Sequence, residues 1–172
     1  MAAAAEAALP RVLCLHGSCQ SAELFAAKIG TLQKKLRHVA SLHFVDAPHQ
    51  VEGCGQDARC WWQSGAQRGR PHPLWPEQWA RSLEALRGVL RAASESGAPF
   101  DGVLGFSNGA AAAAMLLSAL HAGEGGVGEA MAPRFAVLCA GYLPAALVGA
   151  PRLPVTSLHV LGTSDEQVPL EQ

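Results

Sequence analysis

The chain has 172 residues, of which 49% are hydrophobic and 16% charged, and its formal net charge is −1. That apolar fraction excludes a disordered chain, and the length predicts one packed domain spanning residues 1–172. A near-zero charge argues against nucleic-acid binding, which requires a basic stripe. We also expect no membrane span, because no run approaches the roughly 20 apolar residues that cross a bilayer.

The first 45 residues predict two strands joined by a helix. Arg11–Leu15 is rich in Leu and Val and ends at His16-Gly17, a pattern typical of a strand followed by a turn. Ser21 is a candidate cap for the next helix, whose apolar residues recur at helical spacing from Phe25 to Leu36. A second strand is expected at Val39–Val45.

Residues 49–76 form a long segment rich in Gly, Pro, Arg and Trp, without clear periodicity. Loops of this length are typical of lids and binding loops, so we expect a lid-like irregular insertion. Trp61 and Trp62 lie within it. We predict that both contact substrate as walls of an acyl pocket, which is where large apolar side chains are commonly found.

The second half alternates helices and strands. Helices are expected at Pro76–Ala93 and Asn108–His121, and strands at Phe100–Phe106, Phe135–Ala140 and Ser157–Leu161. Strands separated by helical stretches indicate a mostly parallel sheet with helices on both faces. The predicted fold class is α/β, a three-layer sandwich.

The sharpest chemical signal is G-x-S-x-G, which extends from Gly105 to Gly109 between a predicted strand and a predicted helix. A serine at such a sharp turn has its hydroxyl exposed in a strained conformation, and the glycines avoid collisions around it. Ser107 is therefore the predicted nucleophile. The backbone N–H of Asn108, at the helix N-terminus, is a predicted oxyanion donor.

Two further loops complete the predicted site. The His16-Gly17 pair follows the first strand, where hydrolases of this architecture supply a second oxyanion donor. The Ser18 N–H is our candidate, with Cys19 as the next alternative. We place His16 among the residues that contact substrate. Asp165 follows the last strand and is the predicted triad acid, with Glu166 as the alternative, because the order serine then acid suits this fold.

The chain resembles the FSH family of serine hydrolases. The resemblance implies an α/β-hydrolase fold, no cofactor, and carboxylesterase or thioesterase-like activity on small-molecule acyl esters. Asn108 stands where that family more often has Gln, a mild departure because the backbone N–H is the group required. The matching blocks are Leu13–Gly17 with Gln20, Trp61-Trp62, Pro99–Ser107, and Ser157–Val160 with Gly162, Asp165 and Pro169.

Such enzymes place the catalytic histidine in a loop after one further strand, and none of the seven histidines stands there. We therefore expect this histidine, with the last strand and helix, beyond Gln172, so the chain is expected to be a C-terminally truncated hydrolase. His49 or His72 of the insertion is an alternative base. The competing hypothesis is a non-catalytic hydrolase fold that binds a ligand or another protein.

The five cysteines are odd in number and contain no C-x-x-C pair. This pattern favours a reducing compartment and a cytoplasmic location, with Cys14 and Cys139 as free thiols in apolar runs. No metal is predicted, because the metal-ligating residue types of the insertion do not have zinc spacing. Those residues are His49, Cys54, Cys60 and His72.

Overall fold

The computed structural model describes residues 8–63, 75–123, 131–166 and 168. Its centre is a five-stranded sheet in which every pairing is parallel, with strand order β2-β1-β5-β6-β7. The predicted parallel α/β architecture is confirmed. The strands are β1 (Arg11–Leu15), β2 (Ser41–Val45), β5 (Gly102–Phe106), β6 (Phe135–Cys139) and β7 (Thr156–Val160).

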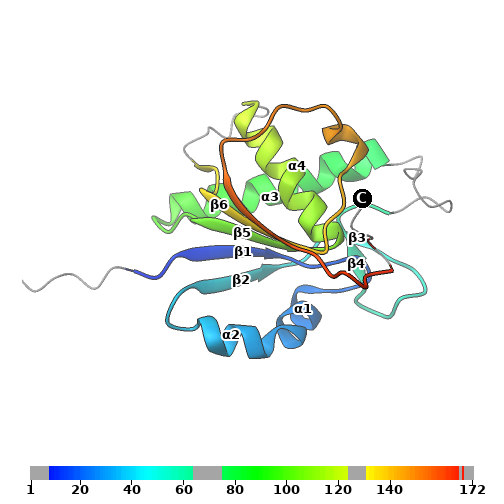
Figure 1. Cartoon of the computed structure of the whole chain (residues 1–172), viewed down its shortest axis with the longest axis horizontal. Coiled ribbons are helices and arrows are strands. Elements are labelled where there is room, and N and C mark those ends of the chain that lie inside the picture. Colours follow the sequence, from blue (N-terminus) through cyan, green and yellow to red (C-terminus); the bar gives the residue numbers. More distant parts are fainter. Residues whose placement is uncertain (1–7, 64–74, 124–130, 167, 169–172) are drawn as a thin grey trace, which may run out of the picture.

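Helices cover both faces of the sheet (Figure 1). Helices α1 and α2 lie below the sheet in this view, and α3 and α4 lie above it. The result is the three-layer arrangement expected from the sequence. The helices are α1 (Ala22–Lys28), α2 (Gly30–Leu36), α3 (Trp75–Glu95) and α4 (Asn108–His121), with a short 3-10 turn at Ala145–Leu147.

Two apolar clusters hold these layers together, one on each face of the sheet. The larger cluster joins α3 and α4 to the sheet and includes Leu13, Leu86 and Leu116, all nearly inaccessible to solvent. On the other face, Phe25 of α1 packs with Val12 and neighbouring residues. Burial of apolar surface on both faces explains why the strands are nearly continuous hydrophobic runs rather than alternating patterns.

The order in which the chain adds strands to the sheet reverses between β1 and β5, which are parallel, hydrogen-bonded neighbours. From β1 the connection runs outward to β2, whereas from β5 it runs the other way to β6. In parallel α/β sheets, ligands bind at the carboxyl ends of the strands at such a switch point. The loops after β1 and β5 therefore form the expected location of a site.

Most element boundaries agree with the sequence prediction, but the first helix does not continue to Leu36 without interruption. It divides at Ile29, whose backbone is non-helical and whose N–H bonds back to Phe25 and Ala27. Gly30, a weak helix former, follows directly. The predicted Ser21 cap is confirmed, because its hydroxyl accepts a 3.2 Å hydrogen bond from the Leu24 N–H.

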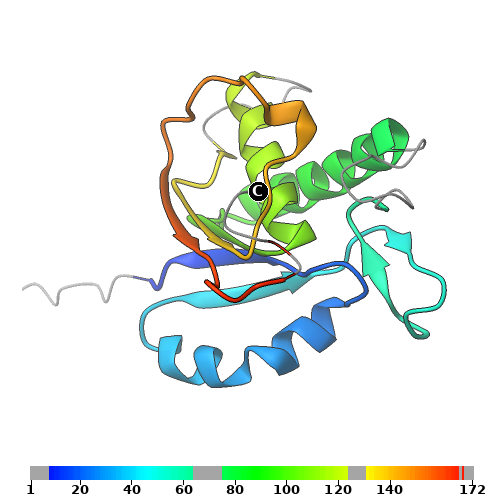
Figure 2. The same ribbon diagram turned by 45° about the vertical axis from the view of Figure 1, so that its right-hand side comes forward.

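The insertion is not irregular throughout. Strands β3 (His49–Gln50) and β4 (Arg59–Cys60) pair as an antiparallel hairpin, which Figure 2 shows beside the main sheet. Gln20 forms a bridge with Arg59, so the hairpin is joined to the loop after β1. The chain then enters the core, and residues 64–74 of the insertion lie outside the described residues.

The expectation from cysteine count needs a correction. Cys19 and Cys54 form a disulfide with their Cα atoms 5.5 Å apart, whereas Cys14, Cys60 and Cys139 are free. The bond joins the loop after β1 to the turn of the β3–β4 hairpin. Sequence spacing did not reveal it because folding brings together positions that are 35 residues apart. In the part of the chain that is described, no helix is long and apolar enough to cross a membrane.

Candidate active site

Ser107 occupies the turn between β5 and α4, with φ 51° and ψ −117°. Non-glycine residues rarely adopt a positive φ, and such strain is concentrated at functional sites. The Ser107 N–H donates a 2.9 Å hydrogen bond to the Cys139 carbonyl at the end of β6, which fixes the turn. Although Ser107 precedes α4, its side chain makes no capping hydrogen bond to that helix.

The two glycines of the motif are required by close backbone approach. A Cβ at Gly105 would overlap the Gly109 carbonyl and the backbone of Ala110. A Cβ at Gly109 would overlap the carbonyl oxygens of Leu15 and His16. The pattern therefore allows α4 to begin directly against β1, and it brings the two candidate loops together.

Asn108 is the first residue of α4, so its backbone N–H is among those that a helix leaves without an intrahelical acceptor. The helix dipole adds a partial positive charge at this end. The Asn108 side chain is 3% exposed, and it also makes contacts that the sequence did not predict. Its Oδ1 accepts a 2.9 Å bond from the Trp61 N–H, and its Nδ2 donates to the Tyr142 hydroxyl at 3.2 Å.

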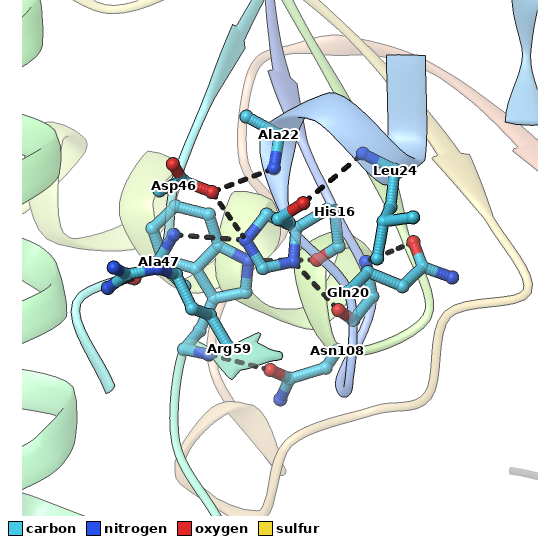
Figure 3. Close-up of polar contacts among 11 residues, drawn as sticks. His16, Gln20, Ala22, Leu24, Asp46, Ala47, Arg59 and Asn108 are labelled. Carbon is cyan, nitrogen blue, oxygen red and sulfur yellow. Dashed lines mark hydrogen bonds and ion pairs between the residues drawn. The ribbon is translucent and has the colours of Figure 1, made fainter. Parts of the chain in front are cut away.

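His16 is completely buried at the start of the loop after β1 (Figure 3). The Ala47 N–H donates to its Nε2 at 3.0 Å, so its other nitrogen, Nδ1, carries the proton and donates to the Gly17 carbonyl at 2.8 Å. Burial lowers the pKa of His16, and the Asp46 carboxylate 4.0 Å away only partly offsets this effect. His16 is thus a neutral ring that shapes the loop.

The rest of this loop is fixed by short-range contacts. The Gly17 N–H donates to the Gln20 side-chain carbonyl at 3.3 Å. Cys19 has a positive φ of 59°, which turns the chain sharply after Ser18. These contacts and the Cys19 disulfide define the path of the backbone that carries the predicted Ser18 donor.

Asp165 lies in the loop after β7, at the same carboxyl edge of the sheet as Ser107, because all five strands are parallel. Its Oδ1 accepts a 3.0 Å bond from the Val168 N–H, and its own N–H donates to the Gly162 carbonyl at 3.2 Å. Asp165 is half-buried whereas Glu166 is exposed. Asp165 as the acid of the site stays a prediction.

The histidines within the described residues are engaged away from Ser107. His49, the alternative base, contacts the Gln78 carbonyl through Nε2 at 2.8 Å, and His159 is exposed on β7 beside Ser157. His72 lies outside the described residues. The others make the following contacts: His38 with Arg37, His43 with Arg11 and Ser41, and His121 with the Leu117 carbonyl.

A cavity of about 540 Å³ opens between the loop after β1 and the β3–β4 hairpin. Ser18 lines it, whereas Ser107 is not among its described lining residues. Trp61 and Trp62, predicted to be pocket walls, are 0% and 4% exposed and belong to the core cluster. The sequence prediction missed most of the lining because the hairpin has no periodic pattern. The other lining residues are Gln50, Val51, Glu52, Cys60 and Gln63.

Tyr142, in the segment after β6, is a second residue that the sequence prediction missed. Burial raises the pKa of its phenol, so it stays protonated and able to hydrogen-bond. Its ring also meets Trp62 edge-on, with centroids 6.5 Å apart. It is the only tyrosine of the chain, and its neighbours in sequence gave no signal of this position.

A strained serine at the switch point of a parallel sheet, beside a helix N-terminus, is the arrangement found in α/β hydrolases. Comparison with known proteins agrees with this class. Residues 6–172 match the family model described as serine hydrolase (FSH1), and the chain belongs to that family. It is thus a serine hydrolase, which favours the enzyme over the alternative of a non-catalytic binding protein.

Relatives named esterase OVCA2 cover nearly the whole chain. The Danio rerio protein is 35% identical and the Homo sapiens protein is 34% identical. Each match covers 94% of this chain and 79% of the relative's own length. Two solved plant structures share the fold: Arabidopsis thaliana SOBER1 (TM-score 0.65, 18% identity) and Zea mays acyl-protein thioesterase 2 (TM-score 0.64, 20% identity). Each alignment covers 95% of this chain, together with 79% of the SOBER1 chain and 74% of the thioesterase chain.

Proposed function

We propose that the protein hydrolyses carboxylic or thio esters of acyl groups through an acyl-enzyme intermediate on Ser107. The Ser107 hydroxyl gives its proton to the general base as it attacks the substrate carbonyl carbon. The base returns this proton to the alcohol or thiol, which leaves as the tetrahedral intermediate collapses. Water then attacks the acyl-enzyme and releases the carboxylic acid. The observation that carries this proposal is the strained backbone of Ser107 (φ 51°) at the switch point of the sheet.

In this mechanism the backbone N–H groups of Asn108 and Ser18 stabilise the oxyanion of each tetrahedral intermediate. Such donors act strongly because they are fixed before charge develops; removing one costs about 10²–10³ in kcat. The positive end of α4 contributes to the same stabilisation. We therefore assign Ser107, at the turn between β5 and α4, to a nucleophile elbow.

Asp165 is proposed to orient and stabilise the imidazole of the general base. The base is proposed to be a histidine other than the six described ones, whose side chains contact residues other than Ser107; His72 of the insertion is one candidate.

The cysteines of the site are poor alternatives to Ser107 as nucleophile. Burial raises the pKa of Cys60, which lines the cavity, to about 11. Burial raises that of Cys14 to about 12. Both thiols are therefore protonated near neutral pH, whereas the reactive form of cysteine is the thiolate.

The proposed substrate class follows from the relatives. The curated relatives carry the name esterase, and one structural neighbour is titled an acyl-protein thioesterase. The cavity beside Ser18 is lined mainly by uncharged polar groups, with Glu52 as the only charge among its described lining residues. Ser107 is not among the described residues that line this cavity, so the names of the relatives carry the proposal of esters and thioesters as substrates.

The test compares hydrolysis of p-nitrophenyl acyl esters by the full-length protein and by its Ser107→Ala variant. We expect kcat to fall by more than about 10³-fold, because the nucleophile is removed. Ser157→Ala is the matched control, since this serine is exposed on β7, and its kcat should equal that of the wild type. Equal activity of the wild type and Ser107→Ala would refute the proposal.

A further inference from the structure

Trp61 joins the two loops that carry the predicted oxyanion donors. Its backbone N–H donates to Asn108 Oδ1 at 2.9 Å, and its indole Nε1–H donates to the His16 carbonyl at 2.9 Å. The indole is 0% exposed. A single buried residue, following β4, is therefore hydrogen-bonded both to the start of α4 and to the start of the loop after β1.

Trp61 is itself anchored on the side away from these loops. Its carbonyl accepts a 2.5 Å bond from the Ser82 hydroxyl of α3, which is also fully buried. Its ring lies against the His16 ring, with centroids 5.6 Å apart and planes tilted by 37°. With its position set by a long helix, Trp61 is a rigid support rather than a mobile loop residue.

The two bonds act close to the predicted donors. The His16 carbonyl is separated from the Ser18 N–H by Gly17 alone, so the orientation of that carbonyl limits the direction of the Ser18 amide. On the other side, Asn108 is held by its own side chain. An oxyanion donor is effective only within a narrow range of distances, about 2.7–3.1 Å, so the separation of the two N–H groups matters.

We propose that Trp61 is a positioning residue that keeps the Ser18 and Asn108 amides at the separation an oxyanion requires. This inference rests on the proposed function, because it assigns a role within the same oxyanion hole. Trp61 has no exposed surface and touches no reacting atom. Its effect on catalysis is transmitted through the His16 carbonyl and the Asn108 side chain.

The test uses Trp61→Phe in the full-length protein, which keeps an aromatic ring in the core but removes the indole donor to His16. A shift of about 1 Å in a catalytic group costs up to about 10²-fold, so we expect kcat to fall 10- to 100-fold while KM changes less than threefold. Affinity for a trifluoromethyl ketone, whose adduct with Ser107 bears an oxyanion, should fall by the same factor as kcat. Amide hydrogen exchange should rise at residues 17–19 and stay unchanged in α3.

Trp79→Phe is the matched control, because Trp79 lies on α3 in ring contact with Trp62 at 5.5 Å and donates to neither loop. Its kcat should equal that of the wild type. If Trp61→Phe fails to fold, Trp61 is replaced by benzothienylalanine, which keeps the shape of the indole and replaces its N–H with sulfur. The same loss of kcat is expected.

The outcomes separate this inference from the proposed function. If Ser107→Ala abolishes hydrolysis but either folded Trp61 variant retains kcat within twofold of the wild type, the positioning role is refuted and the serine mechanism stands. If kcat and analogue affinity fall together, the role is supported. If hydrolysis is unaffected by Ser107→Ala, both are refuted.

Discussion

Gly109 of α4 lies directly against the Leu15 carbonyl at the end of β1, leaving no space for a Cβ. Gly109→Ala would therefore force apart the helix that carries Asn108 and the loop that carries Ser18. Because the obstacle is backbone, we expect the free energy of unfolding to fall by about 3 kcal/mol, with loss of esterase activity. Chemical denaturation and p-nitrophenyl ester hydrolysis measure the two effects.

Gly88→Ala provides the control for that substitution. Gly88 lies in the interior of α3, and a Cβ there would meet no atom within 4 Å. Because alanine is the better helix former, this variant should be more stable by about 0.5–1 kcal/mol, with unchanged activity. Equal effects of the two glycine substitutions would contradict the packing argument.

Acid should destabilise the protein through His16. Burial lowers the pKa of His16 in the folded state below the value of 6.5 for the free side chain. As pH falls, the His16 side chain of the unfolded chain is therefore protonated before that of the folded protein. The contribution of His16 to the free energy of unfolding is complete above pH 6.5 and is lost as pH falls below 6.5. Protonation of His16 changes the free energy of unfolding by at most about 1.4 kcal/mol per pH unit.

The measurement is urea denaturation at pH 7.5 and 5.5 for the wild type, His16→Gln and His159→Gln. Burial and the Arg11 charge also lower the pKa of His43, so some acid sensitivity remains in every variant. His16→Gln should lose less stability on acidification than the wild type does. The control variant, His159→Gln at an exposed position, should lose as much stability as the wild type. A wild-type stability that is independent of pH would exclude a neutral buried His16.

The Cys19–Cys54 disulfide should stabilise the fold by closing a loop across 35 positions. The chain-entropy model gives about 3–4 kcal/mol for a loop of this length. A reductant should therefore lower the denaturation midpoint of the wild type and leave that of Cys19→Ser/Cys54→Ser unchanged. No effect of reductant on the wild type would mean that the bond is not formed in solution.

The same bond bears on the location of the protein. The cytoplasmic location remains a prediction from the odd cysteine count, whereas a structural disulfide is typical of oxidising compartments. Cell fractionation of the tagged full-length protein tests it. Recovery in the secretory pathway rather than the cytosol would overturn the prediction.

Asp165 and Glu166 offer a direct comparison of two adjacent acids. Asp165→Asn should lower kcat by about 10⁴-fold, because loss of the carboxylate favours the wrong imidazole tautomer. Glu166→Gln, at an exposed position, should change kcat by less than threefold. The reverse result would assign the triad acid to Glu166.

The sequence predicted best those features that are encoded locally. The bounds of β1 agree with the prediction to the residue, and α4 begins at the predicted Asn108. His16-Gly17 ends the strand, and Ser107 precedes the helix as its N-cap. Ser107 itself was identified by the glycines around it, whose necessity is visible in the backbone contacts. In both cases a few adjacent residues determine the conformation.

The missed features depend on contacts between distant positions. The β3–β4 hairpin has two-residue strands, too short for any hydrophobic period, and the disulfide partner of Cys19 lies in the turn of that hairpin. The Asn108 side chain bonds to Trp61 and Tyr142, which lie 47 and 34 residues away. For Trp61, the residue type alone predicted a wall of the acyl pocket. Its burial and its two donors, the backbone N–H and the indole N–H, instead indicate a support between the loop after β1 and the start of α4.

The proposed mechanism requires Ser107 to be an activated nucleophile. The most direct test is reaction of the folded full-length protein with a fluorophosphonate probe, followed by mass spectrometry of the labelled peptide. We expect one adduct, on Ser107, that disappears in Ser107→Ala and in heat-unfolded protein. Labelling that persists in Ser107→Ala, or an adduct on another residue of the folded protein, would contradict it.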